Sequence, residues 1–301
     1  MGAKALGVAG VTGLVVLALV LTLPSAAPPT LRYVDDGIWS SATAGEPASL
    51  IDFEQSDASK TSWSPDGTEI AYACDPEQHT PDVDGRGLCS ASPDGTHLWT
   101  TAAAPVRFPT WSSDGDGLAY AALGIEGHGS LWVTDRDTPG EAETLCEDWC
   151  PLFRYYSIAW SPDGETVAAV AETPGTGGHP ARIILFDVET HEFELLNTQM
   201  PGLQHGPTWS PDGEHLAFSS TAEGDFDVWR VDLESRTPTR LTHEAGGATN
   251  PTWAPDGSRI VFVSRTDGGG TELRSVAPTG GESSAEVSTG RPTTPLFVDG
   301  P

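Results

Sequence analysis

Trp209-Ser210-Pro211-Asp212-Gly213 is one of five near-copies of the same pentapeptide, and this repeat decides the fold. The other copies begin at Trp63, Trp111, Trp160 and Trp253, so that successive tryptophans are 48, 49, 49 and 44 residues apart. A fixed period of this length is typical of proteins in which one supersecondary unit is stacked several times. We therefore expect most of the 301-residue chain to consist of repeated units.

Within each copy, the order Ser-Pro-Asp-Gly is that of a tight turn between two strands. Proline presets φ for a type I turn, and the final glycine can take the left-handed conformation of a hairpin loop with a bulge. After each glycine comes a short apolar run, such as residues 70–73 or 260–263, which indicates a strand buried on both faces. We expect the tryptophans to pack between neighbouring sheets and the aspartates to be turn residues, not catalytic carboxylates.

Each period has room for four strands. In the fourth copy we predict them at residues 207–209, 216–220, 227–231 and 239–242. Four antiparallel strands in a period of 44–49 residues are typical of a propeller blade.

The two ends of the chain together predict one more blade. Residues 32–35, 37–40 and 47–53 resemble the second, third and fourth strands of a repeat, whereas residues 295–300 resemble a first strand with a shortened turn. Phe297 lies 44 residues after Trp253, where a sixth tryptophan is due. Pairing the ends would remove two open sheet edges. We therefore predict an all-β, six-bladed β-propeller at residues 31–301, closed by one C-terminal and three N-terminal strands.

Residues 1–30 are predicted to lie outside the propeller. The stretch from residue 5 to residue 23 is uncharged and follows Lys4, as in a membrane-spanning helix or a signal peptide. Residues 25–27 resemble a cleavage site, but Pro28 would follow the cut, so we expect an uncleaved anchor with a cleaved signal as the alternative. In both cases Lys4 favours the cytoplasmic side, and the propeller is exported: membrane-anchored and extracytoplasmic, or secreted.

The composition excludes some partners and predicts disulfides. The net charge is −28, with two lysines and thirteen arginines, which argues against a nucleic-acid partner. Four cysteines suit an exported protein, and we predict the disulfides Cys74–Cys89 and Cys146–Cys150, with a zinc site as the alternative. Residues 82–85 with Asp75 resemble part of a calcium loop without its later ligands, so a solvated acidic loop is preferred. We expect no metal, no cofactor and a monomer.

The period, the Trp-Ser-Pro-Asp-Gly turn and the pairing of the ends resemble the TolB-like six-bladed β-propellers, a WD-like repeat superfamily. This resemblance covers about residues 31–301 and implies binding of proteins or peptides, or the gating role of the propeller in prolyl-oligopeptidase-like proteases. TolB itself has an α/β domain before its propeller and docks a peptidoglycan-associated lipoprotein. This sequence lacks such a domain, so we expect a different role. It also has no Gly-x-Ser-x-Gly motif and no following hydrolase domain, so peptidase activity is not expected.

In a propeller the first strands line the central channel, and the loops that enter them form one mouth. Four of the few basic residues fall in these segments, which predicts a positive funnel for a carboxylate or an acidic peptide. The alternative is that these basic side chains only pair with nearby acidic ones. The candidate ligand-binding residues are Lys60, Arg107, Arg154, Tyr156, His205, Asn250 and Arg291.

The sequence thus predicts an exported, membrane-tethered, non-catalytic propeller that binds a protein, peptide or envelope component at its channel mouth. The alternative is a lyase or hydrolase acting on a sugar or lactone in the channel, with His205, Tyr156 and Arg107 as its functional groups. Several convergent titratable groups within hydrogen-bond reach would favour the enzyme.

Overall fold

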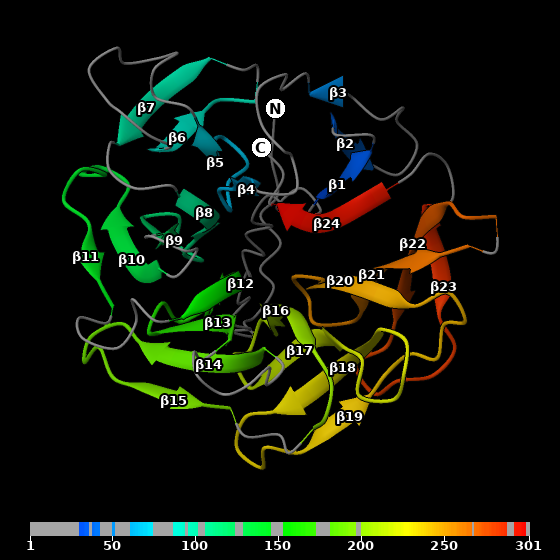
Figure 1. The fold of residues 1–301 in the computed structure, drawn as a ribbon. Coiled ribbons are helices and arrows are strands. Elements are labelled where there is room, and N and C mark those ends of the chain that lie inside the picture. The colour runs from blue at the N-terminus through cyan, green and yellow to red at the C-terminus, as the bar shows by residue number, and fades with distance from the viewer. Residues whose placement is uncertain are drawn as a thin grey trace, which may run out of the picture.

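The computed structural model of the protein describes residues 30–35, 38–42, 50–51, 61–74, 87–93, 96–101, 106–123, 129–145, 153–172, 181–196, 200–266, 268–287 and 292–298. These residues form twenty-four strands in six four-stranded antiparallel sheets, arranged around a central axis (Figure 1). The described residues form no helix, and therefore none that is long and apolar enough to span a membrane. The predicted anchor at residues 5–23 lies outside them.

Five of the sheets each come from one continuous stretch of chain, as the repeat predicts. Their strands are β4 (Thr61–Trp63), β5 (Ile70–Cys74), β6 (Gly87–Ala91) and β7 (His97–Thr101); β8 (Val106–Trp111), β9 (Gly117–Leu123), β10 (Gly129–Asp135) and β11 (Glu143–Thr144); β12 (Arg154–Trp160), β13 (Thr166–Glu172), β14 (Arg182–Asp187) and β15 (Phe193–Leu195); β16 (Gln204–Trp209), β17 (His215–Ser220), β18 (Asp227–Asp232) and β19 (Pro238–Arg240); and β20 (Ala248–Trp253), β21 (Ile260–Arg265), β22 (Thr271–Val276) and β23 (Ser284–Val287).

The sixth sheet joins the two ends of the chain, which confirms the predicted composite blade. Its strand order is β24 (Pro292–Val298), β1 (Thr30–Asp35), β2 (Ile38–Ala42) and β3 (Leu50–Ile51). Leu31 lies opposite Phe297 in the antiparallel pair of β1 and β24. The chain therefore ends its last repeat by pairing with its first strand.

The Ser-Pro-Asp-Gly segments form the predicted turns. In the fourth copy the N–H of Gly213 donates to the Ser210 carbonyl at 2.9 Å, and Gly213 has φ of 74°, in the left-handed region that glycine tolerates. The Asp212 carboxylate accepts from the N–H of Glu214 at 3.0 Å, and the Ser210 Oγ accepts from the N–H of His215 at 2.9 Å. The turn therefore fixes the connection between the first and second strands of each repeat.

The second strand of each repeat is buried on both faces, as its unbroken apolar run predicts. In β13, Val167, Ala169 and Ala171 belong to the core shared with the preceding sheet. Ala168 and Val170 belong to the core shared with the following sheet. Because successive side chains on a strand point to opposite faces, one strand serves both cores.

The repeat tryptophans pack between sheets, as predicted. Trp111, Trp209 and Trp253 each contact apolar residues of the preceding sheet, and so does Trp160. The indole N–H of Trp209 donates to the Ala159 carbonyl of that sheet at 3.1 Å. The indole N–H of Trp160 instead donates within its own turn, to Gly164. These rings hold neighbouring sheets at a fixed orientation around the axis.

A disulfide joins Cys74 and Cys89, which confirms one of the two predicted pairs. The cysteines lie on the adjacent strands β5 and β6, with their Cα atoms 5.8 Å apart, and both are buried. The second predicted pair, Cys146–Cys150, lies outside the described residues.

Candidate binding site in the central channel

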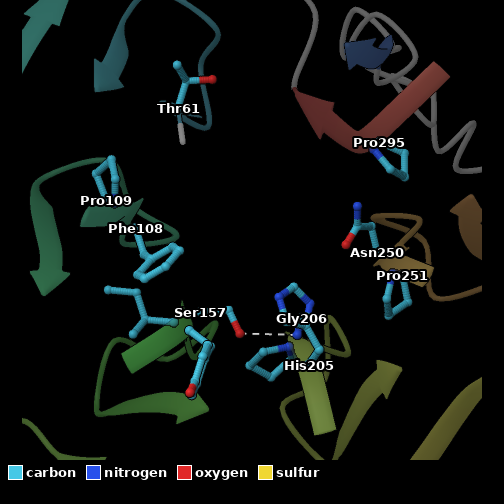
Figure 2. Close-up of a pocket in the computed structure, with 12 residues that line it drawn as sticks. Thr61, Phe108, Pro109, Ser157, His205, Gly206, Asn250, Pro251 and Pro295 are labelled. Atoms are coloured by element: carbon cyan, nitrogen blue, oxygen red, sulfur yellow. Dashed lines mark hydrogen bonds between the residues drawn. The ribbon is translucent and has the colours of Figure 1, made fainter. Parts of the chain in front are cut away.

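A ring of six equivalent residues surrounds the axis. They stand two positions before the repeat tryptophan or, in the composite sheet, before Phe297, on the first strand of each sheet. All six line one cavity of about 340 Å³ (Figure 2). The six residues are Thr61, Pro109, Ile158, Pro207, Pro251 and Pro295. Every sheet therefore contributes to the same cavity, and most of its innermost ring is proline.

The residue before this ring adopts an unusual backbone conformation in three sheets. The φ angles are 54° at Phe108, 60° at Gly206 and 51° at Asn250, and each of these residues lies in a register shift of its strand. Such a bulge turns a side chain away from the regular alternation. Glycine adopts this conformation without strain and asparagine with little, whereas for phenylalanine it costs about 1–2 kcal/mol. The bulges direct Phe108 and Asn250 into the cavity from nearly opposite sides (Figure 2).

Neutral polar side chains gather on one side of the cavity. His205, Ser157 and Asn250 come from three successive sheets, and the Ser157 Oγ accepts a hydrogen bond from the N–H of Gly206 at 3.1 Å. The His205 ring is exposed to the cavity, but the cavity walls surround it, and this desolvation lowers its pKa. The imidazole is therefore neutral at pH 7 and presents one donor and one acceptor.

Tyr156 also lines the cavity, but its hydroxyl is engaged elsewhere. It donates to Glu172 Oε2 at 2.8 Å, and burial, followed by this hydrogen bond, raises the pKa of Tyr156. Arg154, which lies opposite Glu172 in the strand pair, partly offsets this rise. Tyr156 therefore stays protonated at neutral pH and is held by a carboxylate that does not line the cavity.

The structure brings together three of the seven residues predicted at the channel mouth. Tyr156, His205 and Asn250 line the cavity. Arg107 is half-buried on β8 and Arg154 is exposed on β12, and neither lines it. Lys60 and Arg291 lie outside the described residues. None of the described lining residues has a charged side chain, so the positive funnel stays a prediction.

Sequence reasoning missed Phe108 and the ring of prolines. A signal was available, because Pro109, Pro207, Pro251 and Pro295 all stand at the same offset from the repeat tryptophan or its equivalent. Proline has no N–H to donate to a neighbouring strand, so a proline at the same place in each first strand indicates that this strand is the inner edge of its sheet. Phe108 immediately precedes one of these prolines.

The six sheets and the axial cavity define a β-propeller with a cavity at its centre. Residues 155–291 match the family model described as the TolB beta propeller domain. The protein contains a TolB-like propeller.

Three solved structures of similar fold extend over most of the chain. A putative TolB from Agrobacterium tumefaciens is 17% identical with a TM-score of 0.65, covering 91% of this chain and 93% of that one. TolB from Acinetobacter baumannii is 17% identical with a TM-score of 0.68, covering 91% and 67%. Oligogalacturonate lyase from Vibrio parahaemolyticus is 13% identical with a TM-score of 0.54, covering 82% and 74%. The same fold thus occurs in a propeller enzyme as well as in TolB.

Curated relatives match over shorter stretches. An uncharacterized protein of Agrobacterium fabrum is 30% identical over 161 residues, which are 50% of this chain and 47% of that protein. The Tol-Pal system protein TolB of Alcanivorax borkumensis is 38% identical over 69 residues, 23% of this chain and 15% of that protein. The chain spans about half the length, or less, of these relatives.

Proposed function

We propose that this protein is an exported, non-catalytic β-propeller that binds a protein, a peptide or another envelope component at its axial opening. The observation that supports this proposal is the single cavity to which all six sheets contribute. A rigid ring presents such a cavity with little change in shape, which is an advantage in binding. A protein partner also agrees with the name of the Tol-Pal system protein TolB among its relatives.

Export and tethering are part of the proposal. The Cys74–Cys89 disulfide suits an oxidising compartment, and the apolar stretch at residues 5–23 suits an anchor or a signal. We place the tether at residues 1–30 and the propeller, as a monomer, at residues 31–301. The predicted basic residues of the mouth, Lys60, Arg107, Arg154 and Arg291, would then contact a partner that docks at the axial opening.

A pull-down with matched variants tests the docking site. The purified protein, His205→Trp and Leu195→Trp are used as bait against solubilised membranes. The first variant puts a larger ring into the cavity, whereas Leu195 is 53% exposed on the outer strand β15 and serves as the control. We expect a partner captured by the wild type and by Leu195→Trp to be lost with His205→Trp. Equal capture by all three proteins would refute docking at the axis.

An enzyme is the second candidate, because His205 and Tyr156 line the same cavity and the pKa values of both are displaced. Such an enzyme would act on a sugar or a lactone. Binding is favoured over catalysis because the Tyr156 hydroxyl is committed to Glu172, and no hydrogen bond within the described ranges joins His205 to a carboxylate. Release of an unsaturated product from oligogalacturonate by the wild type, lost in His205→Ala, would establish the enzyme; its absence would exclude this substrate.

A further inference from the structure

We propose that the axial cavity binds a neutral sugar ring, with Phe108 packing against one face of the ring and Asn250, His205 and Ser157 bonding to its hydroxyl groups. This inference rests on the proposed function only in that it takes the axial cavity to be a binding site. It adds the chemical class of the ligand and the residues that select it.

The first argument is the neutral chemistry of the described residues that line the cavity. Among the described residues that line the cavity, the polar ones are threonine, serine, tyrosine, histidine and asparagine. His205 is neutral at pH 7 because desolvation lowers its pKa. A charged ligand would lose its hydration against these side chains without gaining a charged partner among the described lining residues. The cavity therefore favours an uncharged ligand, although the protein as a whole carries a charge of −28.

The second argument is that an aromatic ring and polar side chains face each other across the cavity. Phe108 and Pro109 lie on one side of the cavity, and His205 and Asn250 lie across from them (Figure 2). Within the described part of the chain, neither the Asn250 amide nor the His205 imidazole hydrogen-bonds to another protein group, so both face the cavity with donors and acceptors available. A pyranose ring has the matching form, because its C–H face is apolar and its hydroxyls both donate and accept.

The third argument is that the channel is poorly suited to an extended peptide. A peptide strand would bind at the inner edge of a sheet through backbone N–H and C=O groups. Four of the six innermost positions are proline, which has no N–H to offer. Recognition in the cavity must therefore depend on side chains, and these suit a compact ligand. The volume of about 340 Å³ is at the small end of ligand pockets.

The fourth argument is the strained backbone at Phe108, whose side chain lines the cavity. Gly206 occupies the equivalent bulge of the β16–β19 sheet with a similar φ, and glycine at position 108 would relieve the strain there. The other non-glycine residues with positive φ among the described ranges, His191 and Arg236, lie in hairpin turns on the outer side of the sheets, where the turn itself accounts for the conformation. Strain retained at residues that line a cavity indicates that their side chains are needed there.

The test measures ligand affinity by saturation-transfer NMR with the full-length protein. The probes are N-acetylglucosamine as the neutral sugar, glucuronate as its anionic counterpart, and the neutral peptide acetyl-Gly-Pro-Gly-amide. The variants are Phe108→Gly and Asn250→Gly, which suit the positive φ, and the control His191→Gly makes the same backbone change outside the channel, at φ of 59°. Thermal unfolding of each variant shows that it is folded.

We expect the neutral sugar to bind, and its Kd to rise roughly fivefold to tenfold in Phe108→Gly and Asn250→Gly but not in His191→Gly. Transfer should be strongest to the ring hydrogens on one face. Equal affinity in all variants, no transfer to the sugar, or tighter binding of glucuronate or the peptide would overturn the inference. The pull-down and the NMR experiment are separate measurements. The sugar-binding inference can therefore be refuted while axial docking of a partner is supported, and axial docking can be refuted while sugar binding is supported.

Discussion

The Cys74–Cys89 disulfide allows a quantitative prediction about stability. The bond closes a loop with a sequence separation of 15 between adjacent strands of the second sheet from the N-terminus, β4 to β7. In the chain-entropy model, a cross-link over this length stabilises the folded state by about 3 kcal/mol, because the unfolded chain loses freedom. In a domain of this size, that corresponds to a fall of roughly 6–12 °C in Tm when the bond is opened.

Two perturbations separate the cross-link from the packing of the sulfurs. Both are applied to a protein that carries Cys146→Ala and Cys150→Ala, because reduction would also open the predicted Cys146–Cys150 bond. Reduction then opens only Cys74–Cys89 and leaves both side chains in place, whereas adding Cys74→Ala with Cys89→Ala also removes two buried sulfur atoms. We expect reduction to cost about 3 kcal/mol and the double variant to cost about 1–2 kcal/mol more, from the cavities left behind.

The assay is chemical unfolding by guanidinium, followed by tryptophan fluorescence, for the oxidised protein, the reduced protein and the double variant. The m-value shows whether the unfolded state has also changed. If the reduced and oxidised proteins have the same midpoint, the reasoning is refuted, because the bond would then not reduce the conformational freedom of the unfolded chain. A fall confined to the double variant would assign the stability to packing alone.

Three further predictions concern contacts between and within sheets. Glu69 is buried and accepts hydrogen bonds from Arg136 of the next sheet. Glu69→Ala should therefore lower the free energy of unfolding, measured in urea, by about 2 kcal/mol. An unchanged free energy of unfolding would show that this ion pair does not stabilise the fold. The Ser210 hydroxyl, followed by the N–H of Glu214, lowers the pKa of Asp212, and the pKa values of the aspartates in the equivalent turns are also lowered. Such carboxylates stabilise the fold above the unfolded value near 4 and lose this effect as pH falls through the lower folded value. The urea midpoint should therefore fall steeply below about pH 4, after a smaller fall below about pH 6.5 that follows from the lowered pKa of His205. A Cβ on Gly246 would lie 2.3 Å from a backbone carbonyl oxygen, so Gly246→Ala should lower Tm by several degrees, whereas Gly140→Ala, with open space, should not.

The sequence was sufficient for the architecture because the signals for it are local and repeated. The turn at residues 210–213 needs only its own residues to form, and five copies predict the sheet that each one joins. The composite sheet followed from counting strands on either side of the repeats. The disulfide followed from neighbouring strands, since Cys74 ends one and Cys89 lies in the next.

The site was predicted only in part because a bulge changes which side chains reach the axis. The predicted first strand of the fourth repeat began at Pro207, but β16 begins at Gln204 and contains His205 within a register shift. On a regular strand, successive side chains point to opposite faces of the sheet. A bulge adds one residue, so each side chain beyond it points to the face opposite to the one that the regular alternation predicts. Phe108 therefore lines the cavity and the adjacent Arg107 does not. No pattern in a single sequence specifies that shift.

The pairing of β1 with β24 has a consequence for biogenesis. Thr30 of β1 lies opposite Val298 of β24, so β1 finds this neighbour only after 268 further residues have been made. Until then β1 has an unprotected side that can associate with other nascent chains. A protein of this design is therefore expected to depend on a chaperone, or on delayed release, during the interval before β24 has been made.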